Sequence, residues 1–190
     1  MRVSKNMNNA ARTASLRHHI VAGFMIVLAA AVQAAGAGKA AAARQESAAK
    51  TFLSSIYQHY LGKSSGTAVG VALTNADSVR SYFTVGLASL ILEDRAAAVK
   101  RGEPPALEGD PFVGHQEWEI SDLSVDVKDT GALKTKGIVT FTNSGKAEKV
   151  ILELLRSGKE WRIADIQWDS GTLRGLYRRK AVHDSGATPH

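Results

Sequence analysis

The sequence predicts an α+β fold in which helices come first and an antiparallel sheet follows. From Gln45 to about Lys100, apolar residues recur at spacings of three and four, the period of a helix with one buried face. From Trp118 to Trp168, short segments rich in β-branched and aromatic residues alternate with glycine-containing joins. This order indicates two layers, with the helices covering one face of a curved sheet.

The start of the chain has the pattern of a secretory leader. Its first residues are basic and contain no acid: Arg2, Lys5, Arg12 and Arg17. The apolar run 20–32 follows, and Val32-Gln33-Ala34 places small residues where signal peptidase requires them. We therefore expect residues 1–34 to be removed and the mature protein to be periplasmic or secreted. An uncleaved anchor is the alternative, because residues 20–37 are almost uncharged and close to the length that spans a bilayer.

Composition limits the chemistry that the mature chain can perform. The whole chain has 24 basic and 18 acidic residues, and removal of the four leader cations leaves 20 against 18, so no nucleic-acid partner is predicted. There is no cysteine, which excludes disulfides, thiol catalysis and cysteine-ligated metals. The histidines after the leader are scattered, with no pair at the i, i+4 spacing, so we predict neither a metal nor a cofactor.

The helical half is expected to begin after a connector. Residues 35–44 are small and alanine-rich, which indicates a flexible linker. A helix is then predicted from Gln45 to Leu61. A capping box is suggested by Thr74-Asn75-Ala76-Asp77, with Thr74 as the N-cap residue. A second helix should therefore start there and continue to about Lys100, with a kink at Gly86.

The second half is expected to form a meander of about four strands. The first runs from Trp118 to Val127, and a slip in its alternation predicts a bulge near Asp122. Three more strands are predicted at residues 138–142, 147–156 and 160–168, joined by short glycine-containing turns. A short helix at 172–180 should close a single domain spanning residues 45–181, followed by a disordered tail at 182–190. Four cations lie in that helix, and we interpret them as a solvated helix end whose dipole favours positive charge: Arg174, Arg178, Arg179 and Lys180.

The long connection from Arg101 to His115 contains three prolines and no periodicity, which indicates the edge of a site. Polar and aromatic residues gather near it and on the last strand. A cleft lined in this way could use a carboxylate as general base. The catalytic candidates are Asp110, His115 and Asp165, and the candidate ligand-binding residues are Glu117, Trp118, Trp168 and Arg174.

The same residues also allow a purely structural interpretation. Asp110 would cap the turn at Pro111, Trp118 and Trp161 would fill the core, and Asp165 would pair with Arg162 or Arg174.

Several short motifs carry a resemblance to a known family: Asp110-Pro111-Phe112, Gln116-Glu117-Trp118, Trp161-Arg162-Ile163-Ala164-Asp165-Ile166 and Leu173-Arg174. Together they resemble a bacterial family of exported proteins catalogued as domain of unknown function 3828, over roughly Ala48 to Arg179. The resemblance implies a cone-shaped α+β fold like that of nuclear transport factor 2, and it brings no established activity. The family more often has Asp where this chain has Glu117, which leaves the role of that residue open.

Two hypotheses for the function follow. The first is a periplasmic binding or protein-interaction module that uses the concave face of the sheet or the loop from Arg101 to His115, for example an inhibitor or immunity protein that blocks a toxin acting on the envelope. Its partner would be a protein or a small molecule, and it would touch the membrane only through an uncleaved leader. The alternative is a small cone-fold enzyme for proton transfer or dehydration, with Asp110 or Asp165 as base and His115 as acid. An enzyme needs an open apolar cavity containing a carboxylate, whereas an interaction module can have a filled interior and an exposed patch.

Overall fold

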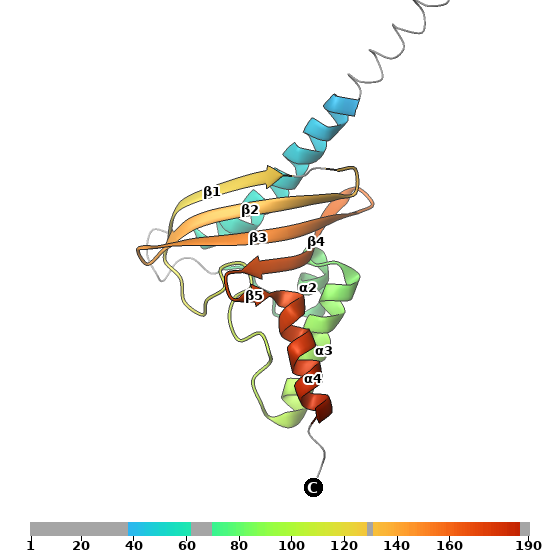
Figure 1. Ribbon diagram of the computed structural model, residues 1–190, viewed down its shortest axis with the longest axis vertical. Helices are drawn as coiled ribbons and strands as arrows, with labels where there is room; N and C mark the ends of the chain where they lie inside the picture. The colour runs from blue at the N-terminus through green and yellow to red at the C-terminus, as the bar shows by residue number, and fades with distance from the viewer. Residues whose placement is uncertain (1–37, 62–69, 129–130, 187–190) are drawn as a thin grey trace, which may run out of the picture. The chain divides into compact units, whose positions relative to one another are not determined.

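The computed structural model describes residues 38–61, 70–128 and 131–186, with side chains up to residue 180 (Figure 1). The expected leader at residues 1–34 lies outside the described residues. Arg44–His190 forms one compact unit, and the fold and the site described below belong to it.

The N-terminal helix spans residues 38–57 and ends in a single 3-10 turn, η1 (Gln58–Tyr60). It buries the face that the sequence period predicts, with Ala49, Leu53, Ile56, Tyr57 and Tyr60 at most 1% exposed. The expected linker at 35–44 is wrong for residues 38–44, which are helical. Alanine has the highest helix propensity, so this segment extends the helix although it has no long apolar side chains to bury.

Two helices follow where one kinked helix was expected, namely α2 (Ala76–Tyr82) and α3 (Val85–Arg101). The cap of α2 is Asn75 and not Thr74, because the side chain of Asn75 accepts from the Ser78 N–H at 2.9 Å and Ser78 completes the capping box. The helical conformation is interrupted just before Thr84 and not at Gly86, where a kink was expected. The Thr84 N–H donates to the Ile163 carbonyl at 2.9 Å, so a tertiary contact with the sheet ends α2.

Among the described residues, the sheet has five antiparallel strands in the order β1-β2-β3-β4-β5, one more than expected. Their bounds are β1 (Ile120–Lys128), β2 (Lys134–Asn143), β3 (Lys146–Ser157), β4 (Glu160–Trp168) and β5 (Gly171–Thr172). The predicted bulge is confirmed: the β1–β2 register shifts between Ser121 and Ser124, and Asp122 has a φ of 51°. The meander and the α+β class are thereby confirmed.

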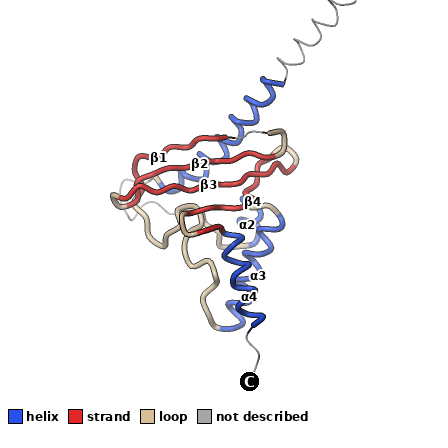
Figure 2. Tube along the Cα trace, viewed as in Figure 1, coloured by secondary structure: helices blue, strands red, loops and turns tan. Residues whose placement is uncertain are grey.

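The helices after residue 75 lie beside the edge of the sheet that β4 and β5 form. Figures 1 and 2 show α2 and α3 together with α4 (Leu173–Gly186) on the side of β4 and β5, and all three contact β4. On β2, a Cβ at Gly137 would overlap with Cδ1 of Leu53 from the N-terminal helix. This glycine therefore allows the helix and the sheet to approach closely.

Helix α4 is longer than the sequence suggested. It continues to Gly186, so residues 182–186 are helical and the expected disordered tail is wrong for them. The Gly175 N–H donates to the hydroxyl of Thr172 at 3.0 Å, which caps the start of the helix. As a result, the four cations interpreted as a helix end lie in the first two turns and the middle of α4.

Candidate functional site

The loop between α3 and β1 is fixed to the N-terminal helix by Asp110. The hydroxyl of Tyr60 lies 2.9 and 2.7 Å from the two carboxylate oxygens of Asp110, and the Phe112 N–H donates to the same carboxylate at 2.8 Å. The Tyr60 oxygen in turn accepts from the Val71 N–H at 3.1 Å. Burial raises the pKa of Asp110, although the bonds from Tyr60, Phe112 and Val113 oppose that shift. The carboxylate thus performs the capping of the Pro111 turn that the structural interpretation expects.

Trp168 at the end of β4 holds the other side of this loop. Its indole N–H donates to the Pro111 carbonyl at 3.0 Å. The ring packs against Gly114, which has a φ of 74° and where a Cβ would lie 2.9 Å from Cδ1 of Trp168. The positive φ and the close contact both require glycine here.

A cleft of about 160 Å³ lies between this loop, the β4–β5 turn and α4. We call it the loop–helix cleft. Its lining combines apolar, aromatic, hydroxyl and charged groups from Leu107, Gly109, Asp110, Gly114, Trp168, Ser170, Gly171, Thr172, Leu176 and Arg179. The volume is below the range of most small-molecule sites and is comparable to a single large side chain.

Asp165 lies outside this cleft and caps α4. Its Oδ1 accepts from the Arg174 N–H at 3.0 Å and from the Ile166 N–H at 2.9 Å. The guanidinium of Arg174 donates to the Ala164 carbonyl at 2.6 Å, and Arg162 pairs with Glu160. The expected ion pair of Asp165 with one of these arginines is therefore wrong, because Arg174 reaches the carboxylate with its backbone N–H.

The remaining candidates point in other directions. Nε2 of His115 lies 3.5 Å from the Glu148 carboxylate, which also pairs with Lys146 at 2.9 Å. The hydrogen bond from Lys146 lowers the pKa of Glu148. Glu117 is exposed, and Trp118 is half-buried with its ring 5.4 Å from that of Tyr60.

The structure thus separates the seven candidates. Only Asp110 and Trp168 line the loop–helix cleft, while His115 faces β3 and Asp165 and Arg174 are used at the start of α4. The sequence reasoning missed Tyr60 as the partner of Asp110, and it missed Leu107 and Leu176 as cleft residues. The sequence identified Arg179 as one of four cations in the C-terminal helix. It could not predict that Arg179 lines the cleft, because that position depends on how α4 packs.

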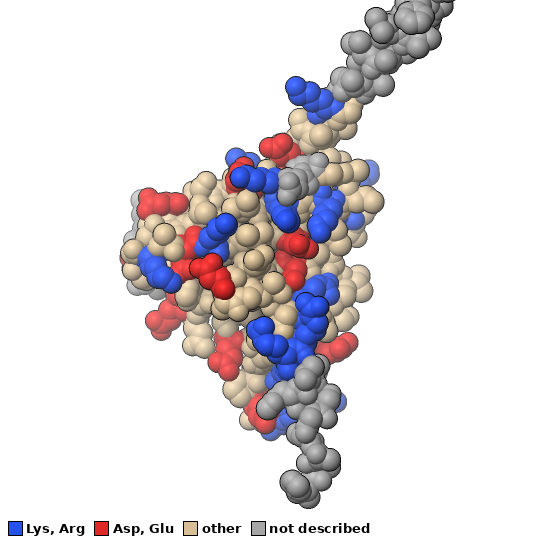
Figure 3. All heavy atoms as spheres, in the orientation of Figure 1, with Lys and Arg blue, Asp and Glu red and all other residues tan. Residues whose placement is uncertain are grey.

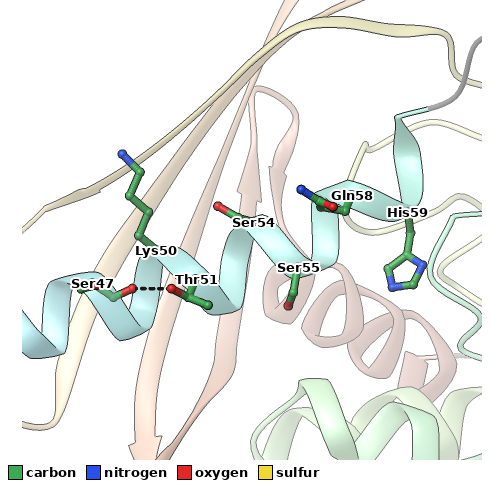
Figure 4. Close-up of a pocket in the computed structure, with 7 residues that line it drawn as sticks. All are labelled: Ser47, Lys50, Thr51, Ser54, Ser55, Gln58 and His59. Carbon is green, nitrogen blue, oxygen red and sulfur yellow. Dashed lines mark hydrogen bonds between the residues drawn. The ribbon is translucent and has the colours of Figure 1, made fainter.

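A second hollow runs along the outer face of the N-terminal helix (Figure 4). Ser47, Lys50, Thr51, Ser54, Ser55, Gln58 and His59 line it. The hydroxyls of Thr51 and Ser55 donate to backbone carbonyls of their own helix, at 2.9 and 2.8 Å. Figure 4 shows these side chains spread along the helix without converging on a common point, so we assign no site to this surface.

The described ranges contain neither a membrane-spanning helix nor a metal-binding cluster. Within residues 38–61, 70–128 and 131–186, no helix has both the length and the apolar character needed to cross a bilayer. Over the same part of the chain, no group of three or more acidic or histidine side chains is arranged to hold a metal ion.

Comparison with known proteins gives a structural similarity but no family. No protein-family model and no curated protein matches the chain, so the resemblance to domain of unknown function 3828 and its cone fold remains a prediction. A solved structure of the type VI effector–immunity complex Tae3–Tai3 from Ralstonia pickettii is similar at 20% identity, over 65% of this chain and 94% of that chain, with a TM-score of 0.39. At that score the similarity carries no argument about function.

Proposed function

We propose that this protein is a non-catalytic protein-interaction module of the bacterial envelope, and that it holds a partner protein at the loop–helix cleft. One observation carries the proposal: the two carboxylates that an enzyme would use are both engaged by the fold itself. Asp110 accepts from Tyr60 and Phe112, and Asp165 accepts from the first turn of α4. A general base needs a carboxylate that can approach the substrate.

The filled interior supports the same proposal. Tyr57, Phe83 and Phe112 are at most 1% exposed between the helices and the sheet, and the Tyr57 hydroxyl donates to the Phe112 carbonyl at 2.7 Å. The sheet surface that these residues cover is therefore occupied by the protein's own core and is not free to bind a ligand. The edge of the loop from Arg101 to His115 remains accessible through the loop–helix cleft.

The cleft has the dimensions of an anchor pocket. Protein interfaces concentrate binding energy where a side chain of one partner fills a preformed pocket of the other. A volume of about 160 Å³, walled by the Trp168 ring and by Leu107 and Leu176, suits one such side chain. The hydrogen bonds of Asp110 and Trp168 hold the wall in place before any partner arrives.

The leader pattern supports an envelope location, and an inhibitor or immunity protein directed against an envelope toxin is the specific form of this function that we favour. Mass spectrometry of the exported protein tests the location, with a mature N-terminus expected near Ala35. An intact N-terminus in the membrane fraction would instead support the anchor.

The enzyme alternative has one observation in its favour, since burial raises the pKa of Asp110 at the cleft wall. However, the imidazole of His115 pairs with the carboxylate of Glu148. The carboxylate of Asp110 binds Tyr60 and Phe112, so the two groups have different partners in the fold.

Site-specific photocrosslinking in the producing bacterium tests the interaction. A photoreactive amino acid is introduced at Leu107 or Leu176 in the cleft, and at the exposed Lys159 in the β3–β4 turn as a matched control. We expect one protein adduct at the cleft positions and none at the control, with mass spectrometry identifying the adduct. The absence of an adduct at both cleft positions, with the variants folded and exported, would contradict the proposal.

A further inference from the structure

We infer that the partner segment carries an acidic side chain next to an apolar one, so that its carboxylate binds Arg178 and Arg179 while its apolar group fills the loop–helix cleft. The inference rests on the proposed function and specifies the chemistry of the partner. Its starting point is the position of the basic residues on α4, shown in Figure 3 as the basic side chains over that helix.

The helix dipole does not account for these two arginines. In a helix running from Leu173 to Gly186, Arg178 and Arg179 lie more than one turn from either end. The dipole stabilises cations only within the last turn. The interpretation of these residues as a solvated C-terminal helix end is therefore wrong, and their positive charge needs another explanation.

The neighbouring cations of α4 have partners within the fold. Arg174 donates to the Ala164 carbonyl, and Nζ of Lys180 lies 3.4 Å from the buried carboxylate of Asp94. Arg178 and Arg179 are exposed, and neither forms an ion pair with any side chain that the structure describes. The guanidinium of Arg179 lies beside Gly171 and Gly175, which have no side chains to cover it.

The nearby acids are mostly engaged elsewhere. Asp94 pairs with Lys180, and Glu103 pairs with Arg101 at 2.7 Å. The charge of Asp169 acts on Lys146, whose pKa is raised chiefly by its hydrogen bond with Glu148 and to a smaller degree by Asp169. Glu108 is exposed on the loop. The positive charge of the two arginines therefore exceeds the remaining acidic charge around the loop–helix cleft.

The apolar part of the inference follows from the cleft that Arg179 lines. Arg179 lines the loop–helix cleft together with Leu107, Leu176 and Trp168, so cationic and apolar groups lie within one small opening. Guanidinium groups bind carboxylates through paired hydrogen bonds, and an apolar side chain gains free energy when it leaves water. A protein segment with both groups matches this surface, whereas a lipid headgroup would leave the cleft empty.

Synthetic peptides test the inference with the mature protein. One probe peptide has four glutamates around a central leucine, and a second differs only by alanine in place of leucine. The protein variants are Arg178→Gln/Arg179→Gln and the charge-matched control Lys149→Gln/Lys159→Gln, which changes exposed lysines on β3 and the β3–β4 turn. Binding is measured by fluorescence anisotropy, and circular dichroism verifies the fold of each variant.

We expect the leucine peptide to bind about fivefold more tightly than the alanine peptide. The arginine variant should weaken binding by about tenfold or more, while the lysine control stays within about twofold. An equal loss in both variants would overturn the inference, because binding would then depend on overall charge. Equal affinities of the two peptides, or arginine-dependent binding to phosphatidylglycerol vesicles in place of the peptides, would also overturn it.

The crosslinked partner separates this inference from the proposed function. If an adduct forms at Leu107 or Leu176 but the purified partner binds the arginine variant with unchanged affinity, the inference fails and the proposed function stands. If no adduct forms at either position, the proposed function fails.

Discussion

The hydroxyl of Tyr60 lies within 2.9 Å of both carboxylate oxygens of Asp110, although the two residues are 50 positions apart in the chain. The same oxygen accepts from the Val71 N–H, so one side chain ties together the N-terminal helix, the segment after residue 70 and the loop that walls the cleft. The loop–helix cleft is therefore preformed by the core and does not depend on a bound partner.

Tyr60→Phe should lower the free energy of unfolding by about 1–3 kcal/mol, because a buried N–H and a half-buried carboxylate both lose their partner. Tyr82→Phe is the matched control, since Tyr82 is half-buried and its hydroxyl forms no hydrogen bond with the described residues. The control should change stability by less than about 0.5 kcal/mol. Urea unfolding of the three proteins measures the difference, and equal losses in both variants would show that the Tyr60 hydroxyl is not a tether.

Asp110→Asn should have an effect that depends on pH. Burial raises the pKa of Asp110 above 3.8, so the folded protein holds this proton more tightly than the unfolded chain. The resulting stabilisation is fully present below the unfolded pKa and is lost as the pH rises through the folded pKa. Because Asn does not titrate, the stability of the parent relative to the variant should fall as the pH rises above about 4. Urea titrations across this range test the sign, and a relative stability that rises with pH would mean a lowered pKa.

Gly137→Ala should destabilise the protein by about 1–3 kcal/mol through overpacking, since the added methyl would overlap with the fully buried Leu53. Leu53→Ala alone should cost about 2–5 kcal/mol. In the double variant the new methyl occupies space that the leucine has vacated, so its loss should be smaller than the sum of the single losses. Additive losses in thermal unfolding would show that the two residues are not in contact.

Asp165→Ala should cost about 1–2 kcal/mol, the usual loss for a missing helix cap, because the Arg174 N–H at the start of α4 loses its acceptor. Asp165→Asn keeps a side-chain oxygen and should cost less. Thermal unfolding of the parent and the two variants measures this order of stability. An Asn variant that melts above the parent would indicate a desolvated functional charge, and would favour the enzyme alternative.

Trp161→Ala should cost about 3–5 kcal/mol, since the indole is only 4% exposed within the core. Trp118→Ala should cost less, because Trp118 is half-buried and packs mainly on the Tyr60 ring. Chemical unfolding of both variants measures the difference. If Trp118→Ala is neutral while Trp161→Ala is not, Trp118 becomes a candidate for contact with the partner.

The sequence predicted the features that depend on local period and turn chemistry. The buried face of the N-terminal helix, the antiparallel meander and the bulge near Asp122 were all recognisable from the spacing of apolar residues. The errors lie at element ends. The cap at Asn75 is one residue from the expected position, and the break at Thr84 exists because Ile163 supplies a hydrogen-bond acceptor from a distant strand.

The geometry of the candidate site depends on contacts between distant residues much more than the secondary structure does. The sequence predicted Asp110, His115 and Asp165 as candidates for one site, but it could not predict that each side chain would bind a different partner in the fold. Side-chain direction at the end of a strand or within a loop is set by neighbours far along the chain, such as Tyr60 for Asp110 and Glu148 for His115.

By itself, the sequence determined the α+β class, the order of the helices and strands, the absence of thiol chemistry and the basic character of the C-terminal helix. Only the tertiary structure decided that α4 begins beside the loop, which brings Arg179 to the cleft with Leu107 and Trp168. The physical reason is that periodicity records which face of an element is buried, whereas the meeting of two elements depends on how their buried faces pack together.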